Sequence, residues 1–236
     1  MSRSRGRWGV IAGLTILAVA LFAAIAEIST QEAADEDPVA LEGVREAQRI
    51  FGGLRQHRDR VGDPAAPVTM QFFTDLQCGN CAEQFLDTVP ALVDELVRTG
   101  RAQIHYRHYS FSRNAIQRGF VAAKAAGEQG YQWQYAYIFF ASQEEGQRLG
   151  VDDEYMDAIA ASIPELDRDR WQERLEQGGG EEGEITRELM RQDEIALNLE
   201  LRAEPSVIVT GPGGTETVQD SPSLDQIRAA VAQVSR

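Results

Sequence analysis

The sequence contains only two cysteines, Cys78 and Cys81, and both lie in one Cys-Gly-Asn-Cys segment. No disulfide is therefore possible elsewhere in the chain, and the small ring between these two would constrain little of the unfolded state. A bond between them is better explained by chemistry than by stabilisation. Zinc is disfavoured, because a structural zinc site needs four ligands and commonly two such cysteine pairs. The remaining alternative is an inert pair in the core.

Basic residues are also scarce. Lysine occurs once, at Lys124, so 22 of the 23 basic residues are arginines, and the 37 acidic residues give a net charge of −14. Nucleic-acid binding requires a basic surface, so we expect no nucleic-acid partner. The same charge argues against adhesion of the folded part to an anionic membrane surface. Solubility is a sufficient explanation for the acidity.

Histidines are too few and too badly spaced to predict a metal site. Of the three, His105 and His108 lie in a predicted strand, Ala102 to Tyr109. Their odd spacing places them on opposite faces of a strand, whereas two ligands on one strand need even spacing. We therefore expect no metal and no cofactor.

The residues that flank the cysteines carry the clearest signal. A β-type run, Val68 to Phe73, precedes them, and apolar residues at helical spacing follow from Phe85 to Val97. The thiols thus lie where a strand leads into a helix. The first turn of a helix has unpaired N–H groups and a partial positive charge, which stabilise a thiolate. Cys78 is the predicted attacking sulfur, and Cys81 is the predicted resolving thiol.

The N-terminal region predicts a membrane segment. Three arginines within residues 1–7 precede an uncharged run, 8–26, whose nineteen residues would span about 28 Å as a helix. We expect residues 1–28 to form a cytoplasmic stub and a transmembrane anchor, with membrane contact through 8–28. A signal peptide cleaved after 24–26 is the alternative, but the apolar run is longer than usual for one.

The rest of the chain divides into a tether and one domain. Residues 29–61 are expected to form an acidic tether and an edge helix, and residues 62–236 the domain itself. Residues 57–67 are turn-rich and lead into the first strand. After the cysteine helix come the second strand and a helical region from 113 to about 200. Its last helix, 181–201, is expected to turn Ile185, Leu189, Ile195 and Leu199 inward. Two short strands and a last helix then follow: Val207–Val209, Thr215–Val218, and a helix that opens with a capping box, Ser223 to Gln226.

Three segments carry a resemblance to a known family: GDPAAPVT at 62–69, FTDLQCGNC at 73–81 and EPSVIV at 204–209. Over roughly residues 50–236 the chain resembles the DsbA-like thiol-disulfide oxidoreductases of the thioredoxin-fold family, of the membrane-tethered bacterial type. The cysteine motif alone is moderately specific. Its combination with a proline that enters a strand more than a hundred residues later is strong.

The resemblance implies an α/β thioredoxin fold with a DsbA-type helical insertion at about 113–200, preceded by an N-terminal transmembrane helix. It implies a cis peptide bond at Pro205, close to the cysteine pair. It also implies a substrate groove formed by Pro205, Glu204, Gly79 and Asn80, where substrate backbone pairs like an added strand.

The implied chemistry is dithiol–disulfide exchange with exported proteins that carry thiols. A membrane-embedded, quinone-linked thiol oxidase would restore the disulfide, and the domain would lie on the extracytoplasmic side of the cell membrane, held by a single span. We expect an oxidase. The alternatives are a reductase or isomerase of the same fold, and a non-catalytic thioredoxin-fold subunit that binds a partner in a membrane assembly.

Two positions depart from the family pattern. The residues between the cysteines, Gly79 and Asn80, lack the histidine of the strongest oxidants, so the oxidising power is expected to be milder. Glu204 stands where the family commonly has a small or β-branched neutral residue. A carboxylate near Cys78 would disfavour the thiolate and raise the pKa of Cys78, unless the Glu204 side chain points to solvent.

Overall fold

A computed structural model describes residues 39–111, 118–180 and 182–236 of the chain. The predicted membrane segment, 8–28, and the acidic stretch up to residue 38 lie outside the described residues. Within the part that is described, no helix is both long enough and apolar enough to cross a membrane.

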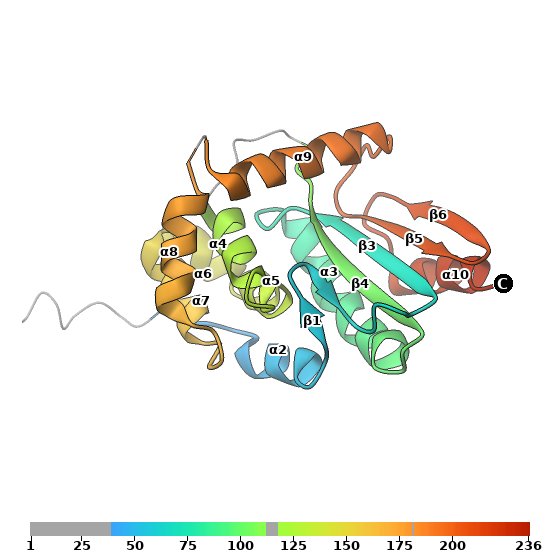
Figure 1. Ribbon diagram of the computed structural model, residues 1–236, viewed down its shortest axis with the longest axis horizontal. Helices are drawn as coiled ribbons and strands as arrows, with labels where there is room; N and C mark the ends of the chain where they lie inside the picture. The colour runs from blue at the N-terminus through green and yellow to red at the C-terminus, as the bar shows by residue number, and fades with distance from the viewer. Residues whose placement is uncertain (1–38, 112–117, 181) are drawn as a thin grey trace, which may run out of the picture. The chain divides into compact units, whose positions relative to one another are not determined.

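The described residues contain a mixed six-stranded sheet with strand order β1-β2-β4-β3-β5-β6 (Figure 1). The strands are β1 Gln56–His57, β2 Arg60–Val61, β3 Val68–Thr74, β4 Ala102–His108, β5 Ser206–Gly211 and β6 Gly214–Val218. Only β3 and β4 run parallel, and the other neighbours are antiparallel. A parallel pair needs a long crossover connection, which the cysteine helix supplies here.

The helices of the described residues fall into four groups. The edge helix is α2 Val44–Phe51; the crossover consists of α3 Gly79–Leu92 and the π-helix η1 Val93–Val97; the last helix is α10 Leu224–Val234. Between β4 and β5 the described residues form six helices: α4 Arg118–Gly127, α5 Gln132–Ala141, α6 Gln143–Leu149, α7 Asp153–Ala161, α8 Arg168–Gly178 and α9 Glu184–Asn198. Figure 1 shows α9 lying along the sheet, while α4 to α8 gather beyond it.

The alternation of side chains along β3 divides the core in two. Phe72 points to the face covered by α3 and α5, where it meets Trp133 at 5.8 Å between ring centroids. Phe73 points to the opposite face and packs with Ala196 of α9 and with Ile208. Successive strand residues face opposite ways, so two adjacent phenylalanines serve two cores. Each contributes roughly 1.5–3 kcal/mol through burial.

An aromatic cluster joins the helical insertion to the cysteine helix. Trp133 of α5 stacks on Phe85 of α3 with ring centroids 5.4 Å apart and also contacts Phe51 of α2 at 6.0 Å. All three rings are buried. The insertion is therefore packed directly against the element that carries the cysteines.

Most predicted elements are confirmed, with three differences. The segment expected to be only turn-rich, 57–67, contains the hairpin β1–β2, and α6 was not expected as a separate helix. Ile195 and Leu199 were expected to face inward but are 51% and 46% exposed. The buried stripe of α9 runs through Ala196 instead, which turns the preceding residue about 100° away from the core.

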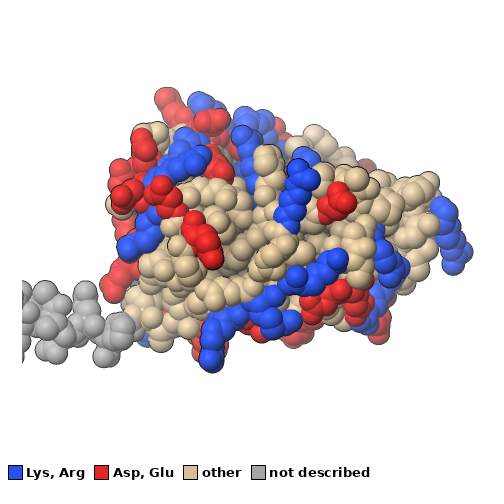
Figure 2. All heavy atoms as spheres, turned by 60° about the horizontal axis from the view of Figure 1, so that its bottom comes forward, with Lys and Arg blue, Asp and Glu red and all other residues tan. Residues whose placement is uncertain are grey.

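Charged residues of both signs share the surface. On the face shown in Figure 2, Asp and Glu side chains alternate with Lys and Arg side chains, and the centre carries few charges. The net negative charge therefore does not form one acidic patch on this face.

Candidate active site

Cys78 occupies the N-cap of α3, with extended backbone angles of φ −84° and ψ 120°. The backbone N–H of Cys81 donates to the Cys78 sulfur at 3.3 Å, as an N-capping side chain normally accepts from the first turn. Cys78 is half-buried and Cys81 is completely buried. The Cys78 sulfur is thus accessible to another molecule, whereas the Cys81 sulfur is covered.

The pKa values of the two thiols are shifted in opposite directions. The hydrogen bond from the Cys81 side chain, followed by that from its backbone, lowers the pKa of Cys78 to about 7; burial and the charges of Glu204 and Asp75 oppose this. Burial, followed by the hydrogen bond to Cys78, raises the pKa of Cys81 far above its usual range. Near neutral pH, Cys78 is therefore about half ionised to the thiolate, whereas Cys81 stays a thiol.

The Glu204–Pro205 peptide bond is cis, which confirms the prediction for Pro205. β5 begins at the next residue, Ser206, which pairs with Phe73 on β3. Just beyond that end of β3, the backbone N–H of Asp75 donates to the Cys81 sulfur at 3.5 Å. The proline loop and the cysteine loop therefore emerge together at one end of the sheet.

The Glu204 side chain is directed to the backbone rather than to open solvent. Its Oε2 accepts a hydrogen bond from the N–H of Phe111 at 2.5 Å. Partial burial, with the charges of Asp75 and Asp193 adding to it, raises the pKa of Glu204, and its carboxylate acts on the Cys78 thiolate. The expectation that Glu204 disfavours the thiolate agrees with this arrangement.

Gly79 and Asn80 lie at the surface beside Cys78. A Cβ added at Gly79 would meet nothing within 4 Å, so the space in front of this residue is open. Asn80 lines a hollow of about 360 Å³ together with Gln84 of α3 and Leu224 of α10. An extended chain that approached Cys78 could therefore pass over these two residues without a steric barrier.

Two residues of this site were missed by sequence reasoning. The Gln143 amide of α6 donates to the carbonyls of Leu76, at 2.8 Å, and Cys78, at 3.4 Å, which ties the cysteine loop to the insertion. Asp75 is buried; it accepts the Gln77 N–H at 2.8 Å, and burial raises its pKa. An acidic residue at the end of an apolar strand could have been noticed, but nothing in the sequence indicates Gln143.

Asp193 and His108 form a polar pair at the end of β4. Asp193 of α9 accepts the Ser110 N–H at 3.0 Å, and its other oxygen lies 3.7 Å from Nε2 of His108. Burial raises the pKa of Asp193 to about 6 and lowers that of His108 to about 4. His108 is therefore neutral at pH 7. His105 lies on the opposite face with Gln103, as its spacing predicted.

The described residues include no group of three or more His, Cys, Asp or Glu side chains arranged to hold a metal ion. The chemistry that the site can perform with its own groups is that of its two sulfurs. An accessible thiolate next to a buried thiol can exchange a disulfide bond with another molecule.

Comparison with known sequences agrees with this chemistry. The family model described as Thioredoxin matches residues 56–233. The probable disulfide bond formation protein D of Bacillus anthracis is 21% identical over 174 residues, which cover 72% of this chain and 75% of that protein. The protein of the same name from Bacillus cereus is 21% identical over 154 residues, covering 64% and 69%.

Solved structures share the fold. Wolbachia pipientis α-DsbA1 has a TM-score of 0.59 at 15% identity, with 75% of this chain and 89% of that chain covered. Oxidised BdbD from Bacillus subtilis also has a TM-score of 0.59, at 14% identity, with 75% and 91% covered. The insertion between β4 and β5 is thus part of a known variant of the fold.

Proposed function

Because the chain belongs to the thioredoxin family and is a DsbA-like thiol-disulfide oxidoreductase, we propose that it oxidises the thiols of exported proteins through Cys78 and Cys81. The observation that carries this proposal is the difference between the two sulfurs. Cys78 is accessible, with a pKa lowered to about 7, whereas Cys81 is buried and its pKa is raised. A stabilised thiolate favours the reduced form of the pair, which makes its disulfide an oxidant.

The proposed reaction has two exchange steps. A substrate thiolate attacks the Cys78 sulfur of the Cys78–Cys81 disulfide, and Cys81 leaves as a thiolate that takes up a proton. A second substrate thiolate then attacks the substrate sulfur of the mixed disulfide, and Cys78 leaves as a thiolate. The substrate loses two electrons and gains a disulfide, while the cysteine pair gains two electrons and is reduced.

Pro205, Glu204, Gly79 and Asn80 form the proposed substrate groove. The residues before β5 end beside the cysteine loop, and the surface over Gly79 is open. A substrate segment that lies along this end of the sheet could pair with exposed backbone groups as an added strand. Such pairing would select an extended conformation rather than a particular side chain.

Recycling and location belong to the same proposal. A membrane-embedded, quinone-linked thiol oxidase would accept the two electrons from the reduced pair. Residues 8–28 would anchor the chain, with the domain on the extracytoplasmic side, where disulfides persist. After reduction of the disulfide on intact cells with a membrane-impermeant phosphine, a membrane-impermeant maleimide should then label Cys78. Labelling that requires cell lysis would contradict this location.

The oxidase role is tested by the equilibrium of the Cys78–Cys81 couple with glutathione. Because Gly79 and Asn80 stand where the strongest oxidants have a histidine, we expect a milder oxidant than those, with a potential between about −120 and −200 mV. A potential near about −270 mV, which is typical of thioredoxin, would instead support a reductase.

A further inference from the structure

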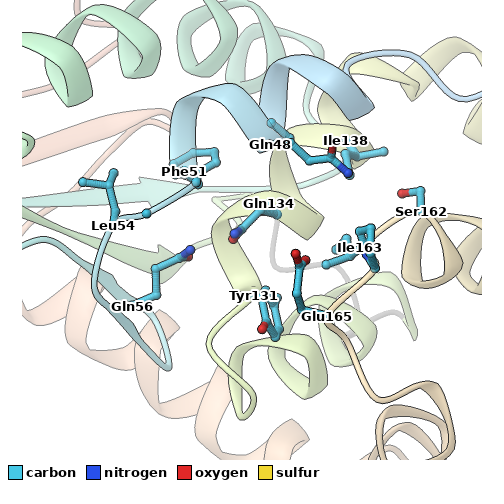
Figure 3. A pocket seen from close by; sticks show the side chains of 14 residues that line it. Gln48, Phe51, Leu54, Gln56, Tyr131, Gln134, Ile138, Ser162, Ile163 and Glu165 are labelled. Carbon is cyan, nitrogen blue, oxygen red and sulfur yellow. The ribbon is translucent and has the colours of Figure 1, made fainter.

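A cavity of about 420 Å³ lies apart from the two cysteines (Figure 3). Its walls come from four parts of the chain: α2 with the residues that follow it to Leu54, Gln56 of β1, the first two turns of α5, and the connection between α7 and α8 that includes Ser162 to Glu165. No residue of the proposed exchange site lines it. Its volume is within the range of pockets that bind small organic molecules.

The wall formed by α5 carries a buried polar group that has no partner among the described residues. Gln134 is only 8% exposed, and none of their donors reaches its Oε1. The Oε1 of Gln56, across the cavity, is also buried and unpartnered. Figure 3 shows these two amides pointing toward one another, with the Glu165 carboxylate turned toward the same space. Buried acceptors without donors are costly, and a bound water, ion or ligand that supplies the donors removes this cost.

The charge and shape of the lining limit the class of ligand. None of the described residues that line the cavity is Lys, Arg or His, whereas Glu165 contributes a carboxylate at its rim. Apolar side chains, among them Phe51, Ile138 and Ile163, form the rest of the wall. The cavity therefore offers hydrogen-bond acceptors and negative charge beside an apolar wall.

We propose that this cavity binds a small organic cation with an amidinium or guanidinium head and an apolar body. Such a head carries several N–H donors in one plane, and can reach a carboxylate while it also donates to amide oxygens. The Glu165 carboxylate and the amide oxygens of Gln134 and Gln56 are its partners. The body packs against Phe51 and Ile163.

The test compares three probes of nearly equal size on the full chain by isothermal titration calorimetry. Benzamidine carries the cationic head, benzamide is its neutral analogue, and benzoate is its anionic analogue. We expect saturable binding of benzamidine, at least about tenfold weaker binding of benzamide, and no binding of benzoate, since only the first supplies charge-assisted donors.

Glu165→Gln tests the charge. It should weaken benzamidine binding about fivefold and leave benzamide binding unchanged, because an exposed ion pair contributes modestly. Glu154→Gln removes another exposed carboxylate, on α7 and outside the cavity, and should change the binding of neither probe.

Gln134→Leu tests the amide and has a matched control on the same helix. Gln132 is also buried, at 3% exposure, with an unpartnered Oε1, but it does not line the cavity. Both leucine variants remove an unsatisfied oxygen and should keep or raise the melting temperature. Only Gln134→Leu should weaken benzamidine binding, by about fivefold or more.

The proposal is overturned if benzamidine shows no saturable binding or binds no better than benzamide. It is also overturned if Gln134→Leu and Gln132→Leu affect benzamidine binding equally. Each of these outcomes is read from binding alone, so none depends on the thiol chemistry.

Discussion

Cys78 and Cys81 have the same side chain, but their surroundings give them different chemistry. The position of both at the start of a helix was predictable, because a β-type run precedes them and helical spacing follows. That Cys78 is the outer, attacking sulfur and Cys81 the inner one also followed from this position, but how deeply each is buried did not, since it depends on how the helical insertion packs over the cysteine loop. The backbone N–H of Asp75 donates to the buried Cys81 sulfur, and this contact likewise depends on the tertiary packing around the loop.

The pH dependence of alkylation should report the lowered pKa of Cys78. Iodoacetamide reacts with the thiolate, so its rate with the reduced protein should be half-maximal near pH 7. Cys81 should stay unmodified in the folded protein because it is buried. Mass spectrometry after timed quenching measures both. A half-maximal rate near pH 9, the ordinary value for a thiol, would contradict the arrangement.

The same shift makes the stability of the reduced protein depend on pH. The folded-state pKa of Cys78 lies below its ordinary value of 9.0. The resulting stabilisation is complete above pH 9 and is lost as the pH falls through 7. Relative to Cys78→Ser, the reduced wild-type protein should therefore gain stability between pH 7 and pH 9.

Removing the charge of Glu204 should make Cys78 more acidic. Glu204→Thr removes the carboxylate that disfavours the thiolate, so the pKa of Cys78 should fall and alkylation at pH 6 should speed up about twofold. Absorbance at 240 nm, which follows the thiolate, measures this. Glu204→Gln keeps an acceptor for the Phe111 N–H and should act in the same direction. An unchanged titration in both variants would show that Glu204 has no electrostatic role.

At the scale of elements, the insertion contributes to the site by holding the cysteine loop. Gln143 is the first residue of α6, and its side-chain amide donates hydrogen bonds to the carbonyls of Leu76 and Cys78. Sequence patterns predicted that helices follow β4, but α6 was not distinguished from its neighbours. Apolar periodicity is weak in its sequence, QEEGQRL, so the usual signal for a helix is missing.

Gln143→Leu should destabilise the protein by about 1–2 kcal/mol, because it leaves the Leu76 carbonyl without its donor. Urea denaturation measures this difference. Gln172→Leu, at an exposed position on α8, is the matched control and should change stability by less than about 0.5 kcal/mol. If the two substitutions change the free energy of unfolding equally, the hydrogen bonds of Gln143 do not hold the cysteine loop.

For the whole molecule, the order of the elements was predictable, whereas the contacts between distant segments were not. Strand and helix periodicity identified β3, β4, β5 and the last helix, whose capping box at Ser223 is confirmed. The hairpin β1–β2 was missed because strands of two residues carry no periodic pattern. The Phe111–Glu204 hydrogen bond joins residues 93 positions apart, and single-sequence patterns contain no information on such pairs.

The N-terminal limit of the folding unit can be tested by truncation. Residues from Val39 onward form one compact unit, in which Ile50 and Phe51 of α2 are fully buried. A chain that begins at residue 39 should keep the unfolding midpoint and the exchange rate of the full chain. A chain that begins at residue 62 loses both side chains and should be destabilised by about 3–6 kcal/mol.

Chemical denaturation of the three chains measures these differences. The two truncated chains differ by α2 and the hairpin β1–β2. If the shorter one is as stable as the longer one, α2 is not an integral part of the fold. If the longer one is itself unstable, residues before 39 contribute to the domain.

Trapping of a mixed disulfide tests most directly whether Cys78 is the sulfur that exchanges. Reduced Cys81→Ser is mixed with a peptide that contains a disulfide; the Cys78 thiolate should attack it, release one peptide thiolate and remain joined to the other half. Mass spectrometry should show a stable adduct at Cys78, whereas wild type should release the peptide and close the Cys78–Cys81 bond. Cys78→Ser should form no adduct, since Cys81 is buried. An adduct at Cys81 in that variant, or none in either, would contradict the account.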